Sequence, residues 1–138
     1  MTGFLLDTNI VSELRKATRS DAGVRRWMDA HANAELWLSV LVIGELRRGV
    51  ELIRRRDIAA AATLDAWLDG LLDQYEDRVL PVTTRVAERW ARITVPNPVS
   101  IIDGLLAATA IEHGLTLVTR NVADVASTGV ASLNPFTD

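Results

Sequence analysis

Three acidic residues lie in surroundings that otherwise favour apolar side chains. Asp7 directly follows the apolar residues 4–6, a pattern that predicts a short buried strand with a carboxylate at its end. Glu45 and Asp103 each share one face of a predicted helix with apolar residues three, four or seven positions away. Because isolated buried charge is costly, such carboxylates must be paired, desolvated or bound to a cation.

A fourth polar residue, Asn121, follows the predicted strand 115–118 as Asp7 follows its own strand. If these strand ends are neighbours in a parallel sheet, the three acids and Asn121 converge on one pocket. The two histidines, His31 and His113, are expected at solvent-exposed helix ends. Carboxylates gathered without histidine or cysteine form a hard oxygen site suited to Mg²⁺ or Mn²⁺. Such an ion activates water and stabilises the charge that develops on a phosphate under attack.

Each acid also has a purely structural interpretation. Asp7 could cap the helix that follows it, and Glu45 could pair with an arginine or reach solvent at a helix edge. Asp103 comes three residues after Ser100, as in a capping box, and an acid in the first turn favours the helix dipole. Capping is the better interpretation of Asp103 alone. The recurrence of the arrangement on three elements favours a functional site.

Short apolar segments that alternate with helical patterns predict the elements that position these acids. Strands are expected at 4–6, 36–38, 79–82 and 115–118, with a fifth at the sheet edge within 129–133. Helices are expected at 8–16, from the turn 18–21 to His31, and at 39–56, 57–76, 84–93 and 100–113. This order indicates an α/β fold, a three-layer α/β/α domain with a central, mainly parallel sheet of four or five short strands.

The bulk properties indicate one domain over 1–138, since the 138-residue chain has ordinary domain size and neither repeat nor linker. The absence of cysteine excludes disulfides, thiolate zinc sites and cysteine nucleophiles. Asp7 and Glu13 interrupt any secretory signal, and the longest apolar run, 36–43, is far short of the roughly 18 residues of a membrane span. We therefore expect a soluble cytoplasmic protein that does not bind membranes.

The net charge of −3 argues against a general basic surface for nucleic acid but is compatible with local arginine contacts. Arg48 and Arg55 flank Glu45 on its predicted helix and are candidates to guide an RNA backbone toward the acids. The basic residues within 15–19 are candidates for a second groove wall. An ordinary solvated helix face is the alternative for both sets.

Four segments together resemble PIN-domain proteins of the VapC type, the toxins of bacterial and archaeal toxin–antitoxin pairs. They are LLDTNIVSE at 5–13, SVLVIGELRRGV at 39–50, IIDGLLAATAIEHGLTLVTRN at 101–121, and the closing residues within 129–136. Each segment is weakly specific, but the ordered set spans the chain nearly end to end. The resemblance implies a PIN-like fold.

The resemblance also implies a Mg²⁺- or Mn²⁺-dependent endoribonuclease with tRNA or ribosomal RNA as its substrate. It implies a homodimer, or a larger assembly, neutralised by a cognate VapB-type antitoxin. Asp7, Glu45 and Asp103 match the first three acids of the family and are expected to carry metal binding and catalysis. An apolar groove between the helices near 21–31 and 57–76 is the expected seat of an amphipathic antitoxin helix.

Further motif residues have supporting roles in this resemblance. Thr8 and Asn9 complete the first motif, and Thr119 matches the polar residue that follows the last inner strand. Asn121 occupies a position where many members have a fourth acid, and its neutral amide holds a second cation less strongly. Asp124 is a candidate to supply the missing charge, with an ordinary loop acid as the alternative.

Two other functions remain open on sequence grounds. A phosphatase with Asp7 as nucleophile predicts a second aspartate at the position of Asn9 and a lysine near the later motif around Asp103, and the chain has neither there. A cation-binding or partner-binding PIN-like module with weak or no catalysis is the main alternative, and Asn121 is the only residue that favours it.

Overall fold

A computed structural model describes residues 3–137. Its centre is a five-stranded sheet in the order β3-β2-β1-β4-β5, in which each pair of neighbouring strands is parallel. The strands are β1 (Gly3–Leu6), β2 (Glu35–Ser39), β3 (Val79–Leu80), β4 (Thr116–Val118) and β5 (Ser132–Leu133). The predicted α/β fold with a parallel sheet of short strands is therefore confirmed.

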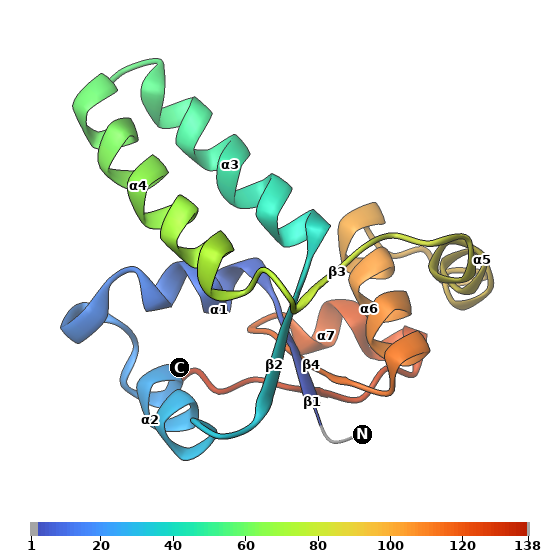
Figure 1. The fold of residues 1–138 in the computed structure, drawn as a ribbon. Coiled ribbons are helices and arrows are strands. Elements are labelled where there is room, and N and C mark those ends of the chain that lie inside the picture. Colours follow the sequence, from blue (N-terminus) through green and yellow to red (C-terminus); the bar gives the residue numbers. More distant parts are fainter. Residues whose placement is uncertain (1–2, 138) are drawn as a thin grey trace.

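Helices cover both faces of this sheet. Before β3 the chain forms α1 (Thr8–Leu14), α2 (Ala22–Ala30), α3 (Val40–Arg54) and α4 (Ile58–Gln74); after it come α5 (Thr84–Ile93), α6 (Ile101–His113) and α7 (Val122–Val125). Figure 1 shows α1 and α2 on one side of the strands and α5 and α6 on the other. Right-handed crossovers explain this, because the chain moves outward from β1 to β3 and then returns to β4. Among residues 3–137, no helix combines the length and the apolar composition that a membrane span requires.

The two helices α3 and α4 form an antiparallel pair that projects beyond the sheet (Figure 1). Arg47 contacts the carboxylates of Asp65 and Asp69 on α4 at 2.7 and 2.9 Å. Arg54 contacts Asp65 as well as Glu51 on its own helix. These two arginines link α3 to α4 through ion pairs, and their charges are already paired with those of acidic residues.

The register of the central strands brings the carboxyl ends of β1 and β4 together. Leu6 pairs with Val118, and both side chains are fully buried. The next residue along β1 is Asp7, whose N–H donates to the Val118 carbonyl at 3.0 Å. Thr119 is the next residue along β4. The sheet therefore places Asp7 and Thr119 side by side at its carboxyl edge.

Several helix ends follow from single residues that the sequence identifies. Ser39 Oγ accepts the Leu41 N–H at 3.0 Å and caps α3, and the Asp57 side chain caps α4. Gly114 ends α6 in the left-handed region with φ of 65°, where a residue without Cβ is favoured. These ends were expected, and they are confirmed.

Three short elements differ from the sequence prediction. The first helix ends at Leu14, and a 3-10 turn at Ala17–Arg19 follows it. The third strand is limited to Val79–Leu80, since Pro81 has no N–H to extend the ladder. Helix α7 was not predicted, because a single turn without a side-chain cap carries little periodic signal.

Candidate functional site

Asp7 is the most enclosed of the three acids, with 6% of its surface exposed. Its Oδ2 accepts the Thr119 hydroxyl at 2.7 Å, a contact buried from solvent. Its Oδ1 accepts the Thr8 backbone N–H at 2.7 Å, so Asp7 is also the N-cap residue of α1. The capping interpretation is therefore correct, and it does not conflict with a role in a site.

The pKa of Asp7 is raised above its ordinary value of 3.8, mainly because burial penalises the charged form. The hydrogen bonds from Thr119 and Thr8 partly offset this rise, because they stabilise the carboxylate. The negative charges of Asp103 and Glu45 raise the pKa further. All three acids are therefore close enough to interact, and no cationic side chain within residues 3–137 balances the charge of Asp7.

Glu45 lies on the first half of α3 and turns toward α1. Its Oε1 accepts the Thr8 hydroxyl at 2.6 Å, although the two residues are 37 positions apart. No arginine pairs with Glu45 within residues 3–137, so the predicted alternative of a salt bridge is wrong. Thr8 therefore connects two acids, since its N–H binds Asp7 and its hydroxyl binds Glu45.

Asp103 lies in the first turn of α6 and is half-buried. Its Oδ2 accepts the Ser100 hydroxyl at 2.8 Å. Ser100 has the N-cap position of α6, but its side chain makes no capping hydrogen bond. The capping-box interpretation of this pair is therefore wrong, because the serine is bonded to the acid rather than to the helix backbone.

The remaining motif residues lie around the end of β4. Asn9 Oδ1 accepts the Arg120 N–H at 3.2 Å and ties α1 to the chain after β4. The backbone N–H of Asn121 donates to Thr119 Oγ1 at 3.0 Å, while its exposed side chain makes no hydrogen bond to the three acids. Asp124 is exposed on α7 and likewise makes no side-chain hydrogen bond to them.

The chemistry of this donor set fits a hard divalent cation. Mg²⁺ and Mn²⁺ prefer oxygen ligands such as carboxylates, and a bound cation would offset the burial and the repulsion that raise the pKa of Asp7. Within residues 3–137, however, no three acidic or histidine side chains are already grouped tightly enough to coordinate one ion. Asp7 interacts electrostatically with Asp103 and Glu45, but the acids would have to move closer together to share one metal ion.

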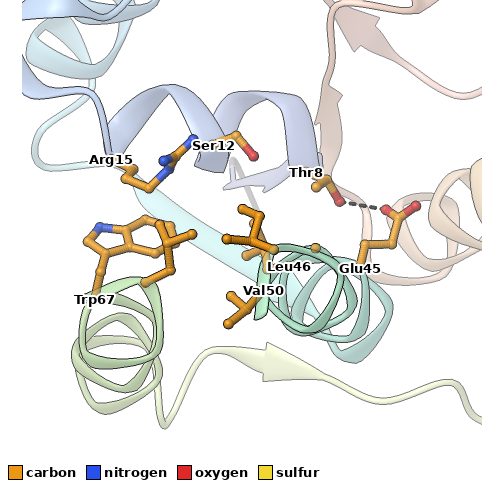
Figure 2. A pocket seen from close by; sticks show the side chains of 10 residues that line it. Thr8, Ser12, Arg15, Glu45, Leu46, Val50 and Trp67 are labelled. Carbon is orange, nitrogen blue, oxygen red and sulfur yellow. Dashed lines mark hydrogen bonds between the residues drawn. The ribbon is translucent and has the colours of Figure 1, made fainter. Parts of the chain in front are cut away.

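A cavity of about 150 Å³ opens beside Glu45, between α1 and the α3–α4 pair. Figure 2 shows Thr8 and Glu45 at one end of it, and Arg15 with Trp67 at the other. Leucine, isoleucine and valine side chains line much of the wall. No described residue of α2 contributes to this lining, and the predicted groove between α2 and α4 stays a prediction.

The candidate RNA-binding arginines differ from their neighbours on α3. Arg48 and Arg55 are exposed and form no ion pair with any residue in the range 3–137. Near the opening motif, Lys16 contacts Glu13 at 2.6 Å, whereas Arg15 and Arg19 form no ion pair with the described part of the chain. Exposed arginines at these positions fit both an RNA-guiding pair and an ordinary solvated helix face, so the role of Arg48 and Arg55 stays a prediction.

His31 is not the solvent-exposed residue that the sequence predicts. It ends α2, as expected, but it is half-buried and stacks on Trp27 with ring centroids 4.3 Å apart. Phe4 meets both rings edge to face. His113, the last residue of α6, is also half-buried. Neither histidine joins the acids.

Comparison with known proteins identifies relatives over almost the whole chain. A PIN domain model matches residues 4–123. Toxin FitB of Neisseria gonorrhoeae is 30% identical over 142 residues, covering 97% of this chain and 99% of that protein. VapC ribonuclease Y4jK of Sinorhizobium fredii is 33% identical over 141 residues and covers 96% of both chains.

Solved structures agree with this similarity. FitAcB from Neisseria gonorrhoeae has a TM-score of 0.86 at 32% identity and covers 96% of this chain and 97% of that one. FitAB bound to an IR36 DNA fragment has a TM-score of 0.85 at 30% identity, with 96% and 94% covered. DNA-bound VapBC from Salmonella typhimurium, at 23% identity and a TM-score of 0.75, shares the fold over 97% and 98%.

Proposed function

Since this chain belongs to the PIN domain family, we propose that it is a divalent-metal-dependent endoribonuclease and the toxin of a type II toxin–antitoxin pair. One observation carries the proposal. Asp7 is buried without a cationic partner in the described chain, and the charges of Glu45 and Asp103 raise its pKa further. A cation bound between the acids would offset both the cost of burying the Asp7 charge and this repulsion. The ribonuclease name of one relative supports RNA as the substrate, with tRNA or ribosomal RNA expected.

In this proposal Asp7 and Asp103 bind the principal Mg²⁺ or Mn²⁺, and Glu45 either binds it directly or orients the attacking water. The bound ion would supply activation of water and stabilisation of charge on the phosphate. Thr119 and Thr8 hold the carboxylates of Asp7 and Glu45 in place through their hydroxyl groups. The neutral amide of Asn121 holds a second cation only weakly, so that ion would arrive with the RNA.

A VapB-type antitoxin is the proposed partner, because FitAcB and FitAB are structures of similar chains in which a second protein is named. The cavity between α1 and the α3–α4 pair suits an apolar side chain of such a partner. Its wall includes Glu45, so an occupant there would also obstruct this acid. A homodimer, alone or within a larger toxin–antitoxin assembly, is part of the same proposal.

The proposal is tested with the purified chain, free of antitoxin, on a structured RNA with Mg²⁺, Mn²⁺ or EDTA. We expect internal cleavage with either metal and none with EDTA. No cleavage with any divalent ion would favour the cation-binding or partner-binding module instead. Hydrolysis of phosphate monoesters without RNA cleavage would favour a phosphatase. Mapping the cut sites across total RNA then identifies the substrate.

Replacing Arg48 and Arg55 with alanine should weaken RNA binding and flatten its salt dependence. Each lost phosphate contact is expected to reduce the slope of log K against log salt by roughly 0.7–0.9. Fluorescence anisotropy with labelled RNA in EDTA, between about 50 and 200 mM salt, measures this without cleavage.

Arg26→Ala is the matched control, because Arg26 is an exposed arginine on α2 that forms no ion pair within residues 3–137. We expect that variant to keep the wild-type slope. An unchanged slope in the Arg48 and Arg55 variants would show that these two side chains are only part of a solvated helix face.

A further inference from the structure

Ser100 occupies the N-cap position of α6, but its side chain does not accept a backbone N–H of that helix. Its φ and ψ of −54° and 147° are non-helical, and α6 begins at the next residue. The caps of α3, α4 and α5 are Ser39, Asp57 and Thr83, and each accepts a backbone N–H of its own helix. Ser100 instead donates its hydroxyl to Asp103 Oδ2 at 2.8 Å. Stabilisation of the helix start is therefore not what this side chain provides.

The backbone around Asp103 is fixed independently of the Ser100 side chain. The Gly104 N–H donates to the Ser100 carbonyl at 2.9 Å. A Cβ on Gly104 would lie 2.9 Å from Trp90 Cδ1 and 3.0 Å from Thr94 Cγ2, so α5 and α6 are in direct contact at this residue. Because α6 cannot shift closer to α5, the direction of the Asp103 carboxylate depends on the rotamer of the Asp103 side chain. The Ser100 hydroxyl is the group that holds this rotamer.

The same arrangement occurs at the other two acids. Asp7 accepts a hydrogen bond from the Thr119 hydroxyl, and Glu45 accepts one from the Thr8 hydroxyl. Asp103 with Ser100 is the third such pair. In each pair the hydroxyl occupies one carboxylate oxygen. At Asp103 the other oxygen, Oδ1, has no hydrogen-bond partner within residues 3–137, so it is available to a ligand.

We propose that Ser100 is a positioning residue that orients Asp103 for metal binding, by holding Oδ2 so that Oδ1 faces the acids' shared cation. This inference rests on the proposed function, because it assigns Ser100 a role toward the same divalent ion. Groups that hydrogen-bond to metal ligands typically change metal affinity by about 10–100-fold when they are removed. Ser100 is exposed, so the lower end of this range is expected.

The test is Mn²⁺ affinity of the purified chain without RNA, measured by electron paramagnetic resonance of free Mn²⁺. Ser100→Ala should weaken Mn²⁺ binding on the order of 10-fold with little change in thermal stability. Ser100→Thr keeps a hydroxyl and should retain the wild-type affinity. Thr83→Ala removes a true cap, whose Oγ1 accepts the Val86 N–H at 3.2 Å, far from the acids in the chain. It should lower the melting temperature and leave Mn²⁺ affinity unchanged.

The outcomes separate this inference from the proposed function. Wild-type affinity in Ser100→Ala overturns the inference alone, provided that the wild-type chain binds Mn²⁺. An equal loss of Mn²⁺ affinity in Ser100→Ala and Ser100→Thr also overturns the inference, because the hydroxyl group would then not be what supports Mn²⁺ binding. A wild-type chain that binds no Mn²⁺ overturns the proposed metal dependence and the role of Ser100 together.

Discussion

Asp7→Asn should abolish divalent-dependent RNA cleavage while leaving the fold intact. The substitution removes the charge of the most buried acid and keeps the shape of the side chain. The amide can still accept the Thr8 N–H, and the Thr119 hydroxyl can rotate to accept from the amide nitrogen. We expect cleavage to fall by about 10³-fold or more, the scale typical of losing one member of a catalytic group. Single-turnover cleavage of a labelled RNA measures it.

Asp124→Asn is the matched control for this substitution, because it removes a charge from an exposed residue that makes no side-chain hydrogen bond to the three acids. It should retain cleavage close to the wild-type rate. Unchanged cleavage in Asp7→Asn would remove Asp7 from the catalytic group. Loss of cleavage in both variants would instead indicate that Asp124 supplies the charge that Asn121 lacks.

Asp7→Asn should also change the pH dependence of stability in the absence of metal. The folded-state pKa of Asp7 is raised above 3.8, so the carboxyl group favours folding most below that pH. This contribution is lost as pH rises through the folded-state pKa, when the buried group must carry charge. Asp7→Asn has no such charge. In EDTA, the free energy of unfolding of Asp7→Asn should therefore increase relative to that of the wild type as the pH rises toward neutrality. Added Mg²⁺ should reduce this difference.

The sequence predicts the helices best where a single residue type determines where a helix begins or ends. Ser39 and Asp57 can each accept a backbone N–H, and Gly114 tolerates a positive φ, so the ends of α3, α4 and α6 follow from residue type. The strand before Asp7 follows from three consecutive large apolar residues. The position of that acid at the carboxyl edge of the sheet follows from the alternation of strands and helices.

The contacts within the site could not be predicted in the same way. Thr8 bonds to Glu45 across 37 residues and Thr119 to Asp7 across 112, and neither pairing is encoded by local periodicity. Local patterns even misled at Ser100, because serine followed three residues later by an acid is also the pattern of a capping box. The acids were recognisable from their surroundings, whereas the hydroxyl groups that hold them depend on tertiary packing.

Thr119→Val should destabilise the chain and impair metal binding together. Valine has nearly the same shape as threonine, but it cannot donate to Asp7 Oδ2 or accept the Asn121 N–H. Thr119 is only 1% exposed, so no solvent replaces these bonds. Leaving a buried polar group unsatisfied costs about 1–3 kcal/mol. Denaturant unfolding at neutral pH should show a loss of this size, because the Thr119 hydrogen bond is a main factor lowering the pKa of Asp7.

Two comparisons separate this effect from a general loss of packing. Thr109→Val makes the same change at a fully buried residue whose hydroxyl donates to the Leu105 carbonyl within α6. That carbonyl keeps its helical environment, so the cost should be smaller. In the Asp7→Asn background, Thr119→Val should also cost less, since the group that it leaves unpaired is a neutral amide and not a charged carboxylate. Equal costs of Thr119→Val in both backgrounds would mean that Thr119 stabilises the sheet edge without supporting Asp7. A smaller cost of Thr119→Val in the Asp7→Asn background would instead mean that the buried Thr119 hydroxyl stabilises the charge of Asp7, the charge that the proposed metal neutralises.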